Sequence, residues 1–172
     1  MPYTIGHRPY AKEGVTIIEL VMVIVMISIL AVLAIPRVDT FYAMKLEGTV
    51  KKVVSDIRYT QQLALARHEN YKIIFNAGND SYVVQRAADN SYATDPFTRT
   101  NMQINLSSDP QFGGVNIATT NLASGTLQFN WEGIPQDATG AALSEQGSVQ
   151  LDYHGNSKTI YITPDTGRVR VE

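Results

Sequence analysis

Glu19 is the only charged residue in a run of 21 residues, 15–35, that is otherwise almost entirely apolar. A carboxylate in a membrane-length apolar helix costs about 2.5 to 3.5 kcal/mol at the bilayer centre and less toward the interface. Such a residue is therefore expected to have a function and a cationic partner. The run begins directly after Gly14.

The other residues that could act in catalysis or hold a metal form no recognisable motif. His7, His68 and His154 have no ligand spacing between them, so a zinc site is not expected. Asp89 and Asp95 lie in a polar stretch that fits a solvated loop better than a calcium site. No nucleophile elbow, phosphate-binding loop or dinucleotide fingerprint occurs. The sequence predicts a protein that is not an enzyme and has no cofactor or metal.

Three cations gather near the C-terminus: Lys158, Arg168 and Arg170. Arg168 and Arg170 alternate with two valines, which in a strand places both guanidinium groups on one face. One interpretation is a solvated sheet edge whose charge discourages aggregation. The other is a patch that contacts the phosphates of DNA. The edge interpretation is the simpler one, and both stay open.

The residues around Glu19 carry a resemblance to a known family. The apolar run and the junction before it resemble the prepilin N-terminus shared by type IV pilins and type II secretion pseudopilins, through the residues Gly14-Val15-Thr16-Ile17-Ile18-Glu19. The resemblance implies that a prepilin peptidase cuts between Gly14 and Val15 and that Val15 is then methylated. It also implies that Glu19 pairs with the α-amine of a neighbouring subunit during filament assembly. The family usually has phenylalanine where this chain has Val15.

The same resemblance divides the N-terminal part of the chain and implies its location. Residues 1–14 would be a cleaved leader, and residues 15–36 a helix that spans the bacterial inner membrane once and later lies in the filament core. Basic residues are more frequent after this span than before it, which alone would favour a cytoplasmic C-terminus. The prepilin-like leader instead implies a cytoplasmic N-terminus and a periplasmic C-terminal domain, which is later part of a pilus or pseudopilus. The implied partners are the prepilin peptidase/N-methyltransferase, the inner membrane, and other minor and major pilins or pseudopilins.

Composition limits the rest of the protein. The chain has 172 residues and no cysteine, so its fold depends on a hydrophobic core and not on disulfides. Without Arg8, Lys12 and Glu13 of the leader, 12 basic and 15 acidic residues remain. No overall basic field would attract nucleic acid.

Helical periodicity resumes after Pro36, where the missing N–H predicts a helix end or a kink. We expect one helix from residue 15 to about residue 68, bent near Pro36, whose amphipathic half covers residues 37–68. Gly48 weakens this half by about 1 kcal/mol relative to alanine. One apolar stripe is expected to face the core, made of Leu46, Val50, Val53, Val54, Ile57 and Ala64, joined by Phe41 and Leu63.

From residue 71 the hydrophobic period becomes two and turn residues separate the runs. Long surface loops are expected at 87–100 and 132–147. Trp131 and Tyr153 fall at strand positions and are expected in the core. The predicted strands are 72–75, 81–86, 102–106, 114–117, 126–131, 148–153, 159–162 and 168–171. The fold class is therefore α+β, with a helical spine packed on an antiparallel β domain, 69–172, and with residues 37–172 folding as one soluble domain.

The C-terminal part resembles a narrower group within the family. The stretch Phe129-Asn130-Trp131-Glu132-Gly133 and residues 160–171 are similar to minor pilins and pseudopilins of the FimT/GspH group, which includes MshC-like pilins. The resemblance implies a pilin fold with two β sheets and a structural subunit that assembles into or primes a filament near its tip. The alternative is a binding module at the tip that catches DNA, as in natural transformation, or surfaces. The shared motifs do not separate a type IV pilus from a type II secretion pseudopilus.

Overall fold

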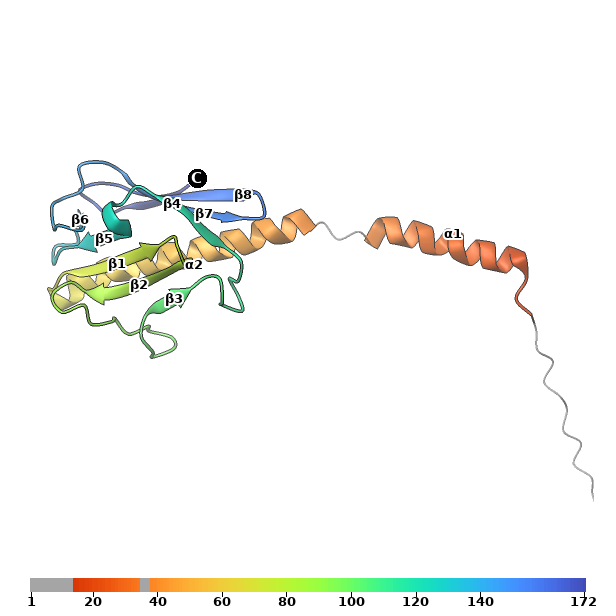
Figure 1. Cartoon of the computed structure of the whole chain (residues 1–172), viewed down its shortest axis with the longest axis horizontal. Coiled ribbons are helices and arrows are strands. Elements are labelled where there is room, and N and C mark those ends of the chain that lie inside the picture. Colours follow the sequence, from red (N-terminus) through yellow and green to blue (C-terminus); the bar gives the residue numbers. More distant parts are fainter. Residues whose placement is uncertain (1–13, 35–37) are drawn as a thin grey trace, which may run out of the picture. The chain divides into compact units, whose positions relative to one another are not determined.

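A computed structural model describes residues 14–34 and 38–172 (Figure 1). The chain divides into two compact units, Met1–Arg37 and Val38–Glu172. The described helices are α1 (Ile17–Ala34) in the first unit and α2 (Val38–Arg67) in the second. Residues 35–37, and with them the kink or helix end expected at Pro36, lie outside the described residues.

Helix α1 begins with a local cap. The N–H of Glu19 donates to Oγ1 of Thr16 at 3.3 Å, and the N–H of Leu20 donates to the carbonyl oxygen of Thr16 at 3.1 Å. Threonine at this position satisfies an N–H group that has no partner within the helix. Every side chain described in α1 is exposed. No helix in the part of the chain that the structure describes is long and apolar enough to cross a membrane.

The second unit places α2 against two antiparallel sheets (Figure 1). The first sheet has the order β3-β2-β1-β5-β6 and the second the order β4-β7-β8-β9. Helix α2 contacts β1 and β5 of the first sheet and β7, β8 and β9 of the second. The strands are β1 (Tyr71–Asn76), β2 (Ser81–Arg86), β3 (Gln103–Asn105), β4 (Asn116–Thr120), β5 (Thr126–Phe129), β6 (Pro135–Gln136), β7 (Gly147–Tyr153), β8 (Asn156–Ile162) and β9 (Val169–Val171). The predicted α+β class, with a helix packed on two antiparallel sheets, is confirmed.

The core forms where α2 meets both sheets. The predicted stripe of α2 is buried from Leu46 to Ala64. It packs with residues that alternate inward along the strands, such as Ile73 and Leu127 of the first sheet and Leu151 of the second. Each fully buried aliphatic side chain contributes about 1.5 to 3 kcal/mol relative to an exposed one. Phe41, which the stripe was expected to include, is instead 62% exposed.

Three sequence expectations for the β domain are wrong in detail. Trp131 is 51% exposed because β5 ends at Phe129, and the Asn130 side chain then accepts hydrogen bonds from the N–H groups of a turn. Asp95 was expected in a solvated loop, but it is buried, and its side chain accepts hydrogen bonds from the N–H groups of Phe97 and Thr98. The stretch 132–147 contains the short strand β6. Tyr153 is buried, as expected.

Candidate assembly site

The two residues expected at the processing junction are both exposed. Gly14 and Val15 are exposed, and a Cβ built on Gly14 would meet no atom within 4 Å. Glu19 lies in the first turn of α1, where the partial positive charge of the helix N-terminus favours a carboxylate. It forms no ion pair with another residue in 14–34. Its expected cation therefore does not come from this described segment.

Within residues 14–34, no other segment covers helix α1. Its first turn contains its only acidic residue, and the rest of the helix is apolar except for Ser28, whose hydroxyl donates to the carbonyl oxygen of Ile24 at 2.7 Å. That bond satisfies the hydroxyl inside the helix itself. An apolar surface of this size is unfavourable in water and marks a site that contacts lipid or protein.

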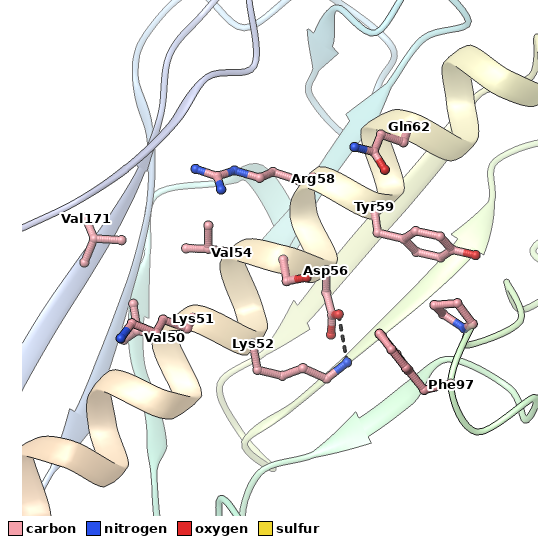
Figure 2. A pocket seen from close by; sticks show the side chains of 12 residues that line it. Val50, Lys51, Lys52, Val54, Asp56, Arg58, Tyr59, Gln62, Phe97 and Val171 are labelled. Carbon is pink, nitrogen blue, oxygen red and sulfur yellow. Dashed lines mark hydrogen bonds and ion pairs between the residues drawn. The ribbon is translucent and has the colours of Figure 1, made fainter.

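A buried charge network, which the sequence did not reveal, fixes α2 to the β domain. Tyr82 of β2 donates its hydroxyl hydrogen to Asp56 Oδ2 at 2.6 Å. Lys52 Nζ donates to Asp56 Oδ1 at 2.8 Å (Figure 2). Lys52 Nζ also lies 3.7 Å from Asp95 Oδ2. The sequence offered one indication of this network. Asp56 lies among the apolar residues of the stripe, and a charged residue at a core position needs a partner.

Two carboxyl groups of this network have shifted pKa values, in opposite directions. Burial raises the pKa of Asp56, although the hydrogen bonds from Lys52 and Tyr82 oppose the shift. Burial also acts to raise the pKa of Asp95. The N–H groups of Thr98 and Phe97 and the charge of Lys52 outweigh it, and the pKa of Asp95 is lowered. The network therefore holds Lys52 between two acids with different environments.

Two of the C-terminal basic residues, Arg168 and Arg170, lie at the edge of the second sheet, and Lys158 lies on the neighbouring strand β8. β9 is an edge strand, and Lys158, Arg168 and Arg170 are exposed. Arg168 precedes the strand. Arg170 Nη2 lies 3.1 Å from Glu172 Oε1, and its guanidinium carbon lies 5.6 Å from the centre of the Tyr161 ring. The sequence predicted both arginines on one face of the strand and both valines on the other. This pattern is only partly present, because Val169 is buried whereas Val171 is 39% exposed.

The histidines are not brought together. The His154 ring stacks on Tyr42 with 4.2 Å between centroids, and the His68 centroid lies 6.2 Å from that of Trp131. His7 lies outside the described residues. Within residues 14–34 and 38–172, no group of three or more His, Cys, Asp or Glu residues could hold a metal ion.

Comparison with solved structures decides the fold. The type IV minor pilin FimU of Pseudomonas aeruginosa superposes with a TM-score of 0.54 at 12% identity, over 76% of this chain and 90% of that chain. The chain has the minor pilin fold. A second crystal form of FimU gives a TM-score of 0.51 at 12% identity, over 74% of this chain and 92% of that chain.

The same fold occurs in a secretion protein. EpsH, a minor pseudopilin from the Type 2 Secretion System of Vibrio cholerae, superposes with a TM-score of 0.54 at 9% identity, over 74% of this chain and 96% of that chain. No protein-family model matches the sequence, and no curated protein matches it. The likeness therefore concerns the fold, and the function must be argued from the residues.

Proposed function

We propose that this protein is a minor pilin or pseudopilin, a structural subunit that assembles into or primes a type IV pilus or a type II secretion pseudopilus. The observation that carries the proposal is α1. It is an apolar helix whose described side chains are all exposed, and it precedes a unit with the minor pilin fold. Such a helix needs lipid or other subunits around it. The role is structural and not catalytic, and it needs no cofactor.

Maturation would begin at the junction between Gly14 and Val15. A prepilin peptidase/N-methyltransferase removes residues 1–14 and methylates Val15, which keeps the new terminus cationic. The exposure of Gly14 and Val15 supports this assignment, since a peptidase needs an accessible bond. In the precursor, residues 15–36 anchor the chain in the bacterial inner membrane, with residues 37–172 as one periplasmic domain. The support for the anchor is the apolar run of the sequence, which continues past the described end of α1 to Ile35.

Assembly would use the charges at the start of α1. An amine at Val15 and a carboxylate at Glu19 are both unfavourable in a hydrocarbon environment without a partner. If neighbouring subunits are offset along the filament axis, the amine of one subunit meets the carboxylate of the next. The pairing removes two unpaired charges at once and fixes the axial register. Its partners are other minor and major pilins or pseudopilins. Its place is at or near the tip, as the resemblance of residues 129–133 and 160–171 to minor subunits implies.

Replacing Glu19 tests this role. Glu19→Ala removes the cost of burying a carboxylate, so membrane insertion should be unchanged or improved while incorporation into filaments falls. The matched control is Ser28→Ala, which changes the other polar residue within α1 and should assemble normally because the Ser28 hydroxyl bonds only its own helix among the described residues. Equal incorporation of Glu19→Ala and the unmodified chain would contradict charge pairing.

A second function, DNA capture at the filament tip, is supported by one observation. Lys158 and Arg168 are exposed and form no ion pair within the described ranges. Exposed cations can contact phosphates with an affinity that falls as salt rises. Arg170 would contribute less to DNA binding, because its guanidinium group already forms an ion pair with Glu172.

The ion pair of Arg170 provides a sharp test of DNA binding. Arg168→Gln with Arg170→Gln should abolish binding to duplex DNA at low salt, and Glu172→Gln should tighten it by freeing Arg170. Thermal stability should change little, because exposed ion pairs contribute about 0 to 1 kcal/mol. If the protein shows no salt-sensitive DNA binding at low ionic strength, these cations are better interpreted as a charged sheet edge that discourages aggregation.

A further inference from the structure

A hollow of about 550 Å³ lies beside β3, an edge strand of the first sheet (Figure 1). Sites for small ligands have volumes in the range of about 300 to 1,000 Å³. Side chains from the stretch 95–101, which precedes β3, form one wall, and side chains from the stretch 105–112 form the other. The proposed assembly through α1 makes no use of this hollow.

Both walls of the hollow are fixed by contacts with other parts of the second unit. Asp95 Oδ1 accepts the N–H of Phe97 at 2.8 Å, and Asp95 Oδ2 lies 3.7 Å from Lys52 Nζ of α2. On the other side, Lys45 Nζ of α2 donates to the carbonyl oxygen of Gly113 at 2.6 Å. Binding to a site that is already ordered costs less conformational entropy. The hollow is therefore prepared for a ligand before the ligand arrives.

The lining of the hollow presents side-chain amides that have no partner within the described residues. Asn101, Gln103 and Gln111 are exposed, and their side chains form no hydrogen bond with a described residue. Gln103 lies on the same face of β3 as Asn105, because alternate residues of a strand share a face. The oxygen of the Asn105 side chain accepts hydrogen bonds within its own turn, which leaves its amino group free. An amide both donates and accepts hydrogen bonds, so the lining matches a ligand whose groups also do both.

Two phenylalanines add aromatic surface to the same hollow. Phe97 is 88% exposed, and Phe112 is half-buried against the core. The face of an aromatic ring carries partial negative charge, so it attracts C–H groups that neighbouring oxygen atoms polarise. The faces of a sugar ring consist of such C–H groups, whereas its hydroxyl groups project from its edge. An exposed aromatic ring beside free amides therefore matches a sugar on both counts.

The charges of the lining disfavour an anionic ligand. The lining contains one cation, Lys52, and two carboxylates, Asp95 and Asp109. The cation already donates to Asp56 and lies close to Asp95. No cation pairs with Asp109 among the described residues, so a phosphate group in the hollow would be repelled by it. A carboxylate accepts hydrogen bonds from hydroxyl groups instead, which favours a neutral ligand rich in hydroxyls.

We propose that this hollow binds a neutral oligosaccharide. One sugar ring stacks on Phe97, and its hydroxyl groups exchange hydrogen bonds with the amides of Gln103 and Gln111. The inference goes beyond the proposed function and does not depend on it, because it concerns a ligand of the second unit alone. It adds a chemically specific attachment site to a chain that is otherwise proposed to be structural.

Ligand-observed NMR by saturation transfer measures this binding with the full-length chain, in a detergent without a sugar headgroup. The probes are neutral tetrasaccharides of glucose, galactose, mannose and N-acetylglucosamine. At least one probe should bind in a saturable way, with an affinity that does not change as salt rises, because salt screens only interactions between charges. Failure of every probe to show saturable binding would overturn the proposal.

Truncation of the exposed ring tests the stacking contact. Phe97→Ala should weaken binding of the probe at least about tenfold, as is typical when an aromatic anchor is truncated. The matched control is Phe41→Ala, which removes another exposed phenylalanine outside the hollow and should bind the probe normally. If Phe97→Ala weakened the binding of duplex DNA and left that of the sugar unchanged, the hollow would be a nucleic-acid site and the proposal would be wrong.

Replacement of two amides tests the hydrogen bonds. Gln103→Leu with Gln111→Leu keeps the side chains close in size, removes their donors and acceptors, and should abolish saturable binding. The control Gln62→Leu with Gln146→Leu makes the same change at two exposed glutamines outside the hollow and should bind the probe normally. Circular dichroism checks that all variants keep the fold. Equal affinity of the two double variants would show that the sugar binds elsewhere, and the proposal would be wrong.

Discussion

Tyr82 and Asp56 join the first sheet to α2 through one buried hydrogen bond of 2.6 Å. Tyr82 is fully buried and Asp56 is nearly so. The acceptor also receives a hydrogen bond from Lys52, which makes it a charged acceptor with two donors. Hydrogen bonds to charged groups are stronger than neutral ones, and loss of one donor leaves a buried carboxylate short of a partner. The position of α2 on the first sheet depends on this pair.

Tyr82→Phe should therefore reduce stability with little change in packing. We expect the free energy of unfolding of a fragment covering residues 38–172 to fall by about 1.5 to 3 kcal/mol, the contribution of a hydrogen bond to a charged group. The control is Tyr161→Phe, because the Tyr161 hydroxyl bonds none of the described residues. Chemical denaturation measures both variants. Equal losses in the two variants would show that the Tyr82 hydroxyl contributes nothing specific.

The pKa of Asp56 predicts a pH dependence with a definite sign. Burial is the main cause that raises this pKa above its usual value of 3.8, so the folded state binds the proton more tightly than the unfolded state. The free energy of unfolding that depends on Asp56 should then decrease as pH rises from 3.8 to the folded pKa. Asp56→Asn should remove this decrease. Denaturation of both proteins across the acidic range measures the difference.

Asp95 provides the opposite control for the same experiment. Despite burial, hydrogen bonds from the N–H groups of Thr98 and Phe97 and the charge of Lys52 leave the pKa of Asp95 lowered. Its contribution to stability is therefore present above the usual pKa of 3.8 and lost as pH falls through the folded pKa. If Asp56→Asn and Asp95→Asn changed the pH dependence in the same direction, the assignment of opposite environments would fail.

The sequence predicted the features that depend on local periodicity and missed those that depend on distant segments. The buried stripe of α2 and most strands follow from apolar spacing, as does β2, which begins and ends where expected. The role of Asp56 could not be seen, because its partner Tyr82 is 26 residues away. The hollow beside β3 was missed for the same reason, since residues of α2 and of two separate stretches line it. The exposure of Trp131 depends on where β5 ends.

Two neighbouring positions on α2 test which face enters the core. Val53 is fully buried, whereas Ser55 is exposed. In the fragment covering residues 38–172, Val53→Asp should prevent folding because it places an unpaired charge in the core. Ser55→Asp should leave the fragment folded. Circular dichroism and limited proteolysis distinguish the two states. A folded, protease-resistant Val53→Asp fragment would mean that this stripe does not pack against the sheets.

The central claim is that this chain is processed and then built into a filament. Intact-mass analysis of the chain extracted from purified pili or pseudopili tests both parts at once. We predict a chain that lacks residues 1–14, starts at Val15 and carries one added methyl group. Substitution of Gly14 by a bulky residue should block the cut. A chain that retains Met1 in assembled filaments, or filaments that never contain the chain, would contradict the account.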